Sequence, residues 1–225
     1  MTYTVVKGDN LTKIAKKFGT TINALVVENG LPDANKIYVG QQLKIPEKAA
    51  AAPAKSLKAE FLAYLEKQIG QIYVWGGQGK NLTELERRGT NPEQWIKNRE
   101  TSKNNANRAI ALYRKKKAAG VNPIMAYDCS GLVMYFLQNM KGIIGVDLSA
   151  ASIYSKCEKL GRDDLEPGDF VFRHNGKTVH HIGVYVGGGK VIESMGRDVG
   201  VVKRSIDASG SKYWNRYGRL EALQK

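Results

Sequence analysis

The sequence predicts two α+β domains joined by a short linker. The linker is the run EKAAAAPAKS (47–56), which is rich in alanine, contains one proline and has no large apolar side chain to bury. Residues 1–46 show strand and helix signals in the order strand, helix, helix, strand. Residues 57–225 begin with helical apolar spacing and change, after Pro167-Gly168, to a period of two that is typical of antiparallel strands.

The small domain has a recognisable signal for each element. TYTVV is β-branched and favours a strand. Asn10 is a suitable N-cap for a first helix. The apolar stripe of this helix consists of Leu11, Ile14, Ala15 and Phe18. A second helix is expected over 21–28, and QQLKIP then predicts the closing strand.

The large domain is expected to pack helices on an antiparallel sheet. Its first helix is LKAEFLAYLEKQIG, and the basic segment that ends at Gly120 is also mainly helical. A further helix begins at Cys129, with Asp128 as its N-cap. Its buried face is expected to contain Leu132, Val133, Phe136, Leu137 and Met140. The predicted strands are DFVFRH, HIGVYVG, KVIESM, VGVVKRS and WNRYGRL.

The composition narrows the class of protein. Of 225 residues, 42% are hydrophobic and 25% charged, as in soluble globular proteins, and no apolar run is long enough for a membrane span. Two cysteines exclude a disulfide scaffold, and we expect Cys157 to be a core thiol. The net charge of +14 indicates an anionic partner, for which nucleic acid, an acidic membrane and the bacterial cell wall all qualify.

Cys129 admits two interpretations, a buried packing residue or a nucleophile. Free cysteine is among the most buried residue types, and Cys129 shares the apolar stripe of its helix. However, a helix N-terminus stabilises a thiolate, and the small neighbours Ser130 and Gly131 leave room for a carbonyl group. A nucleophile would also need an imidazole and a third group that orients it.

His181 is the histidine best placed for that role. It opens the strand HIGVYV, and a hairpin centred near Gly188 would make Glu193 its diagonal neighbour on the same face. His180 would point to the opposite face, and His174 has no such partner. No second cluster supplies further ligands, so we expect no metal and no cofactor.

The segments YTVVKGDNLTKIAKKFGT and ENGLPDANKIYVGQQLKIP resemble a LysM module from its first strand to its last. LysM modules bind polymers containing N-acetylglucosamine, peptidoglycan or chitin, in a shallow groove between two loops. The resemblance implies glycan binding by Gly8, Asp9, Asn10, Leu11, Asn29, Gly30, Leu31, Pro32 and Asp33. Gly8 and Asn29 equally suit a plain turn and a helix cap.

Six segments of the large domain share a second resemblance. IYVWGG, DCSGLVMYFL, LSAASIY, LEPGDFVFR, HHIGVYVGGGKVIESM and YWNRYGRL are similar, in family order, to the papain-like cysteine peptidases of the NlpC/p-sixty superfamily. The similarity covers about 57–79 and 127–220. It implies that the catalytic residues are Cys129 as nucleophile, His181 as general base and Glu193 as the residue that orients His181. It also places Tyr73, Asp128 and Ser130 at the substrate cleft.

Two features depart from that family. Many members have His, Asn or Gln where this chain has Glu193. A basic segment over about 80–126 also replaces a much shorter connection. Between Lys80 and Gly120 it has 11 basic and four acidic residues, half of the net charge. Its cations, among them Arg114 to Lys117, are either a holding site for an anionic wall polymer or part of a solvated helix.

The sequence therefore predicts a monomeric peptidoglycan hydrolase, a LysM-anchored cysteine endopeptidase. The family implies the γ-D-glutamyl to diaminopimelate or lysine bond. Alternatives are an N-acetylmuramoyl–L-alanine amidase and a non-catalytic wall-binding or phage structural protein. A nucleic-acid binder would explain the charge but none of the motifs. MTYTVVKGDN lacks a secretory signal, so a phage-type or mobile-element lysin, or export by a non-Sec route, is expected to act at the cell wall.

Overall fold

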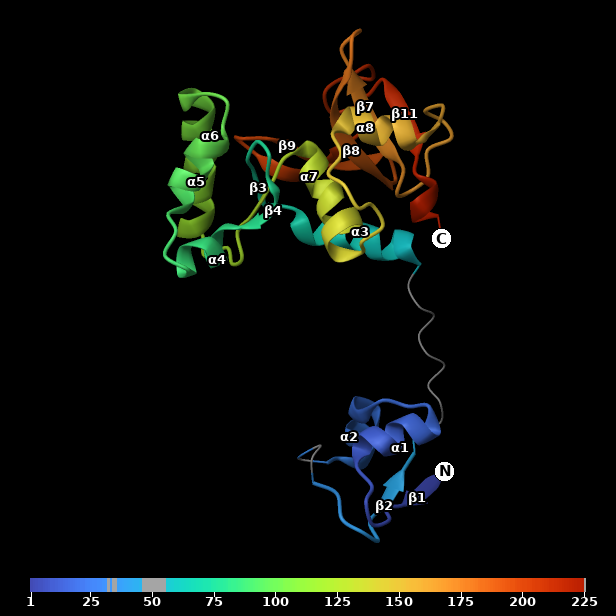
Figure 1. Cartoon of the computed structure of the whole chain (residues 1–225). Helices are drawn as coiled ribbons and strands as arrows, with labels where there is room; N and C mark the ends of the chain where they lie inside the picture. The colour runs from blue at the N-terminus through green and yellow to red at the C-terminus, as the bar shows by residue number, and fades with distance from the viewer. Residues whose placement is uncertain (32, 34–35, 46–55, 225) are drawn as a thin grey trace. The chain divides into compact units, whose positions relative to one another are not determined.

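Residues 1–31, 33, 36–45 and 56–224 are described by the computed structural model of the chain (Figure 1). The chain divides into two units, Met1–Lys55 and Ser56–Lys225, and the division falls within the predicted linker. Of that linker only Ser56 is described, and its hydroxyl group caps the first helix of the second unit. Pro32, predicted to bind glycan, also lies outside the described residues.

The first unit has the predicted order of strand, helix, helix, strand. Its elements are β1 (Thr2–Thr4), α1 (Leu11–Phe18), α2 (Ile22–Asn29) and β2 (Gln42–Lys44). β1 and β2 pair antiparallel, with Tyr3 opposite Leu43. The side chain of Asn10 caps α1 by accepting a hydrogen bond from the Lys13 N–H, as predicted. The core consists of Val5, Leu11, Ile14, Ala15, Leu25, Leu43 and Ile45.

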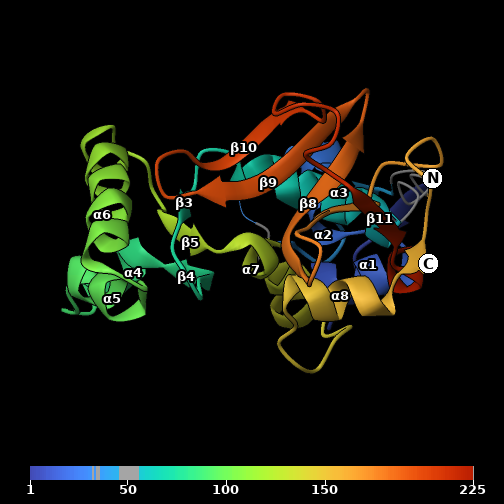
Figure 2. The same ribbon diagram turned by 90° about the horizontal axis from the view of Figure 1, so that it is seen from above.

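The second unit is built on a six-stranded antiparallel sheet of order β10-β9-β8-β7-β11-β6. The strands are β6 (Glu158–Lys159), β7 (Phe170–His174), β8 (Val179–Gly187), β9 (Lys190–Gly196), β10 (Gly200–Ser205) and β11 (Arg216–Arg219). Figure 2 shows β8, β9 and β10 side by side. Their two-residue periodicity predicted these long strands correctly, whereas β6 is too short to show a pattern.

Both faces of this sheet are packed. On one face, α3 (Leu57–Gln68), α7 (Cys129–Met134) and α8 (Ala150–Lys156) share a core with Phe170, Phe172 and Ile182. Cys157 belongs to this core and is buried, as predicted. On the other face, Val171 and Val191 pack against Trp214. Successive side chains of β8 therefore point alternately into two apolar clusters, one on each side of the sheet. Neither face of the sheet is exposed to solvent along its whole length.

A second, three-stranded sheet connects the basic segment to this core. Its strands are β3 (Ile72–Tyr73), β4 (Gln78–Asn81) and β5 (Met125–Tyr127), in the order β3-β5-β4 with β3 and β5 parallel. Between β4 and β5 the chain forms α4 (Leu82–Arg87), α5 (Pro92–Arg99) and α6 (Lys103–Ala118). These helices lie together on one side of the unit in both views (Figures 1 and 2).

One predicted core residue is exposed instead. Met140, assigned to the buried face of the helix that begins at Cys129, is 51% exposed. The α-helix ends at Met134 and continues as a π-helix, Tyr135–Met140. The wider turn of a π-helix rotates the later residues away from the stripe that a period of 3.6 predicts. Among the described residues, no helix is both long and apolar enough to cross a membrane.

Candidate active site

Asp128 fixes the start of the helix that carries Cys129. One carboxylate oxygen, Oδ1, accepts a hydrogen bond from the Gly131 N–H at 2.6 Å, and Oδ2 accepts one from the Gly76 N–H at 2.9 Å. The carboxylate thereby joins the turn after β3 to the first turn of α7. A Cβ atom on Gly131 would lie 1.9 Å from the Gly77 carbonyl oxygen, so only glycine allows this approach.

The Cys129 thiol lies beside strand β8. Burial, reinforced by the nearby Asp128 charge, raises the pKa of this thiol to about 12. The backbone N–H groups of Ser130, Ile182 and Cys129 itself act in the opposite direction, because they favour the thiolate. On this balance burial favours the protonated thiol, so a nucleophilic role for Cys129 would require a neighbouring group that accepts its proton.

His181 and Glu193 form a buried pair on adjacent strands. His181 Nε2 lies 2.6 Å from Glu193 Oε2, and Glu193 has no solvent exposure. Val184 lies opposite Ile192 in the pairing of β8 with β9. When this register is continued along both strands, Glu193 becomes the diagonal neighbour of His181, as the sequence predicts. The imidazole ring also stacks on Trp214, with centroids 5.6 Å apart and planes 13° apart. The ring is thus held at its edge and on its face.

Arg204 completes this arrangement and is not among the residues predicted from the sequence. Its Nε donates to Glu193 Oε1 at 2.5 Å, so the buried carboxylate is bonded on both oxygens. Val202 on β10 pairs with Glu193, which puts Arg204 diagonally across from that glutamate on the same face. The same strand alternation, applied to the pairing of β9 with β10, also predicts that Arg204 is a neighbour of Glu193.

Tyr73 and Ser130 lie close to Cys129. Burial raises the pKa of the Tyr73 hydroxyl well above its usual range, and the Cys129 and Asp128 charges add to this effect. The Arg197 guanidinium lies over the Tyr73 ring, 5.0 Å from its centroid. Ser130 Oγ donates to Asp128 Oδ1 at 3.2 Å. Ser130 lines the same cleft as Cys129, whereas Tyr73 is buried and is not among the residues that line it, so a role for either in substrate binding stays a prediction.

The other two histidines have different surroundings. His180 is largely exposed, and the partial burial of its imidazole, together with the Arg173 charge, lowers the pKa of that ring. His174 Nδ1 accepts a hydrogen bond from the Gly176 N–H at 3.0 Å, which stabilises a turn. Only His181 is hydrogen-bonded to a carboxylate among the residues that the structure describes.

An open cleft of about 480 Å³ exposes Cys129 to solvent. It is lined by Trp75, Gly76, Gln78, Arg99, Asp128, Cys129, Ser130, Asp147, Leu148, Ser149, Ala150, Val179 and His180. Of these residues, Asp128, Cys129 and Ser130 were predicted as site residues, whereas the other ten, among them Trp75, Arg99 and Asp147, were not. Arg99 comes from the basic segment, and no local sequence signal relates it to Cys129.

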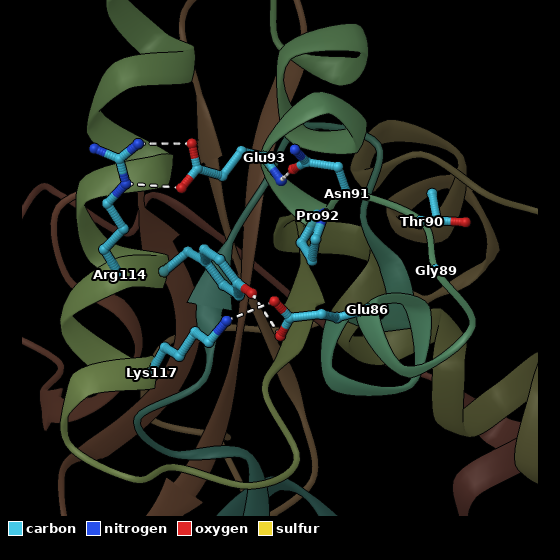
Figure 3. A pocket seen from close by; sticks show the side chains of 9 residues that line it. Glu86, Gly89, Thr90, Asn91, Pro92, Glu93, Arg114 and Lys117 are labelled. Carbon is cyan, nitrogen blue, oxygen red and sulfur yellow. Dashed lines mark hydrogen bonds and ion pairs between the residues drawn. The ribbon is translucent and has the colours of Figure 1, made fainter.

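A second pocket, of about 610 Å³, lies within the basic segment (Figure 3). Arg114 donates to both carboxylate oxygens of Glu93 at 2.7 Å, and Lys117 Nζ lies 2.5 Å from Glu86 Oε1. Two cations of the Arg114–Lys117 run therefore already have acidic partners. The proposed holding site for an anionic polymer is left with Lys115 and Lys116 from this run.

The side chains of the predicted glycan-binding loops mostly hold the first unit together. Asp9 accepts hydrogen bonds from the Tyr3 hydroxyl and the Val6 N–H, and Leu11 is buried in the core. Asn29 bridges to both backbone groups of Lys44 at 2.7 and 2.8 Å. Gly30 ends α2 in a left-handed conformation. Glycan binding by these loops remains a prediction that relies on backbone groups.

Comparison with known proteins agrees with both resemblances. Probable endopeptidase p60 of Listeria grayi is 30% identical over 225 residues, which cover 96% of this chain and 40% of that protein. Probable peptidoglycan endopeptidase LytE of Bacillus subtilis is 28% identical, over 95% of this chain and 52% of LytE. The chain thus spans about half or less of the length of these relatives.

Solved structures give weaker similarities. The NlpC/p60 domain of the peptidoglycan hydrolase SagA is 18% identical with a TM-score of 0.45, over 72% of this chain and 97% of that domain. RipD of Mycobacterium tuberculosis, described as a non-catalytic NlpC/p60 domain protein, is 18% identical with a TM-score of 0.46, over 74% and 99%. The models of two families match directly, the LysM domain over residues 3–46 and the NlpC/P60 family over residues 70–219. The chain therefore belongs to the NlpC/P60 family and has a LysM domain in front of its NlpC/P60 domain.

Proposed function

We propose that the protein is a peptidoglycan hydrolase, a cysteine endopeptidase that cleaves stem peptides. The observation that supports this best is the buried His181–Glu193 pair on β8 and β9, together with a Cys129 thiol that interacts with the Ile182 backbone of β8 and lines a cleft. The names of the relatives point the same way, since p60 and LytE are described as endopeptidases. Membership of the family does not by itself establish catalysis, so the proposal rests on the residues present in this chain.

The proposed reaction begins with proton transfer from Cys129 to His181. Nε2 of His181 faces Glu193, so Nδ1 is the nitrogen that accepts the thiol proton. The thiolate attacks the amide carbonyl, and the Cys129 backbone N–H, at the start of α7, stabilises the oxyanion with Tyr73 nearby. The C–N bond then breaks as His181 protonates the leaving amine. A water molecule, deprotonated by His181, hydrolyses the thioester and releases the acid product.

Arg204 has a positioning role in this proposal. A carboxylate with no exposure is costly unless its charge is compensated, and Arg204 compensates it. With one oxygen bonded to Arg204 and the other to His181, the Glu193 carboxylate can hold the His181 ring in one orientation. In many family members a neutral amide at this position orients the histidine. Here the Glu193–Arg204 pair would do so with two opposite charges that compensate each other.

The bond that we propose is the γ-D-glutamyl to diaminopimelate or lysine amide. The LysM domain would hold the enzyme on the glycan, so the linked catalytic domain meets stem peptides at a raised effective concentration. The same site chemistry would also cleave the N-acetylmuramoyl–L-alanine amide. The new chemical end group on the fragments distinguishes these two reactions.

The test is mass spectrometry of the fragments that the wild type and Cys129→Ala release from purified peptidoglycan. We expect new termini at the γ-D-glutamyl bond with the wild type and none with the alanine variant. Intact stem peptides freed from glycan would identify an amidase. If the wild type pellets with walls of several chemotypes and releases nothing, the protein is a wall-binding protein and not a hydrolase.

A further inference from the structure

The cleft above Cys129 receives one side chain from the basic segment, Arg99 at the end of α5. Arg99 lines the cleft together with Trp75, Gly76 and Cys129. Its Nη1 donates to the Gly76 carbonyl oxygen at 3.4 Å, and its guanidinium lies 5.3 Å from the ring centroid of Trp95. The segment that departs from the family pattern thus contributes a cation to the wall of the cleft.

Arg99 differs from the other arginines of this segment in its partners. Arg87 and Arg88 pair with Glu84, Arg108 pairs with Asp198, and Arg114 pairs with Glu93. Arg99 has no acidic partner within residues 1–31, 33, 36–45 and 56–224. A guanidinium bonded only to a carbonyl group retains most of its five donors for a ligand.

A buried ion pair fixes the backbone next to Arg99. The Glu100 side chain, which has no exposure, accepts hydrogen bonds from the Trp75 N–H at 3.0 Å and from Arg197 Nε at 2.8 Å. Arg197 in turn lies over Tyr73. This network connects α5 to the turn that precedes the nucleophile helix. Arg99 is therefore held at the cleft before any ligand arrives, which reduces the entropy lost on binding.

We propose that Arg99 is a specificity-determining residue that binds the free α-carboxylate of a γ-linked glutamyl residue. This inference rests on the proposed function. A γ-linkage uses the side-chain carboxyl group, so the α-carboxylate stays ionised within one residue of the scissile amide. Arginine suits such a planar anion because its donors form two parallel hydrogen bonds. Trp75, which is 52% exposed in the same cleft, provides apolar surface beside that carboxylate.

The experiment uses two synthetic stem peptides that differ at one group, L-Ala-γ-D-Glu and L-Ala-γ-D-isoglutamine, each followed by diaminopimelate or lysine. In isoglutamine the α-carboxylate is replaced by a carboxamide. We expect the wild type to cleave the carboxylate peptide with a kcat/KM about tenfold or more above that of the carboxamide. Arg99→Gln should bring this ratio close to one while cleavage of the carboxamide continues. Arg99→Lys should keep part of the preference, since it keeps the charge but not the fork.

Lys103→Gln is the matched control, because it removes one positive charge from the same segment outside the cleft lining. It should leave the preference unchanged. Equal cleavage of both peptides by the wild type, or a preference that survives Arg99→Gln, overturns the assignment. If the wild type cleaves neither peptide, the proposed function fails. Calorimetric titration of the two peptides into Cys129→Ala and Cys129→Ala/Arg99→Gln then tests the carboxylate contact alone, and equal affinities would overturn it.

Discussion

Glu193 Oε1 and Arg204 Nε are 2.5 Å apart, on adjacent strands, at a point where the carboxylate has no contact with solvent. We predict that Arg204→Met lowers the free energy of unfolding by about 3 kcal/mol or more, because one partner of a buried ion pair is left alone. It should also lower kcat/KM, since Glu193 loses the partner that fixes its carboxylate against His181. Urea unfolding and stem-peptide cleavage measure the two effects.

The double variant Glu193→Gln/Arg204→Met separates positioning from packing. It removes both charges, so it should recover much of the stability lost in Arg204→Met. Because the amide introduced by Glu193→Gln can still accept a hydrogen bond from His181, the double variant should also recover part of the kcat/KM that Arg204→Met loses. Equal kcat/KM values for the wild type and Arg204→Met would contradict the positioning role, even if stability falls.

The neighbouring histidines provide a matched pair of variants. His181→Gln should lower kcat by about 10²- to 10⁴-fold, the usual contribution of a general base. His180→Gln should change it by only a few fold, although His180 also lines the cleft, because no carboxylate bonds to its ring in the described chain. Release of soluble fragments from peptidoglycan is the assay. Similar losses in both variants would mean that the proton acceptor is misidentified.

The two thiols predict a pH-dependent labelling pattern. Burial raises the pKa of both Cys129 and Cys157 to about 12, so each carries less thiolate than an unfolded cysteine at any pH below that value. At pH 7 we expect iodoacetamide to alkylate Cys129 in the wild type through proton transfer to His181. In His181→Gln the rate should drop about tenfold or more and rise steadily as the pH approaches 12.

Cys157 is the internal control for this labelling. It is buried in the core, where its Sγ donates to the Ile153 carbonyl oxygen at 3.3 Å, so it should remain unlabelled in both proteins until they unfold. Peptide mass spectrometry distinguishes the two sites. Rapid labelling of Cys129 in His181→Gln at pH 7 would show that the backbone N–H groups alone generate the thiolate.

Gly131→Ala tests the contact between the nucleophile helix and the turn before it. The added Cβ would meet the Gly77 carbonyl oxygen at 1.9 Å, and backbone cannot move aside as a side chain can. We predict a loss of about 1–3 kcal/mol in the free energy of unfolding, together with a large loss of activity. Gly145→Ala, which has no neighbour within 4 Å of the new Cβ, should change neither. Equal stability of the two variants would refute the contact.

Local periodicity explains most of what the sequence could predict. The hairpin register follows from a two-residue repeat and a glycine turn, so His181 and Glu193 could be paired without any structure. The small sheet could not be predicted in this way, because β3 has two residues and β5 three, too few to show alternation. The exposed Met140 was missed because a π-helix changes the period within one helix.

Arg99 and Arg204 show where the limit lies within the site. Arg204 is related to Glu193 by strand pairing, a rule that operates on adjacent segments. Arg99 reaches the cleft through the packing of α5 and the Glu100–Arg197 ion pair, which joins residues almost one hundred positions apart. Contacts of this kind depend on tertiary packing, which propensity and spacing do not encode.

The strand pairing at the base of the basic segment also has an evolutionary consequence. Gln78 lies opposite Tyr127 and Asn81 opposite Met125, so the chain enters and leaves these helices at neighbouring points of one ladder. A short hairpin turn would close the same gap. Insertion, deletion or exchange of the three helices between β4 and β5 is therefore compatible with unchanged positions of Cys129, His181 and Glu193. An exchange of this kind would replace Arg99 and the rest of the basic segment without altering the strand pairing that joins His181 to Glu193.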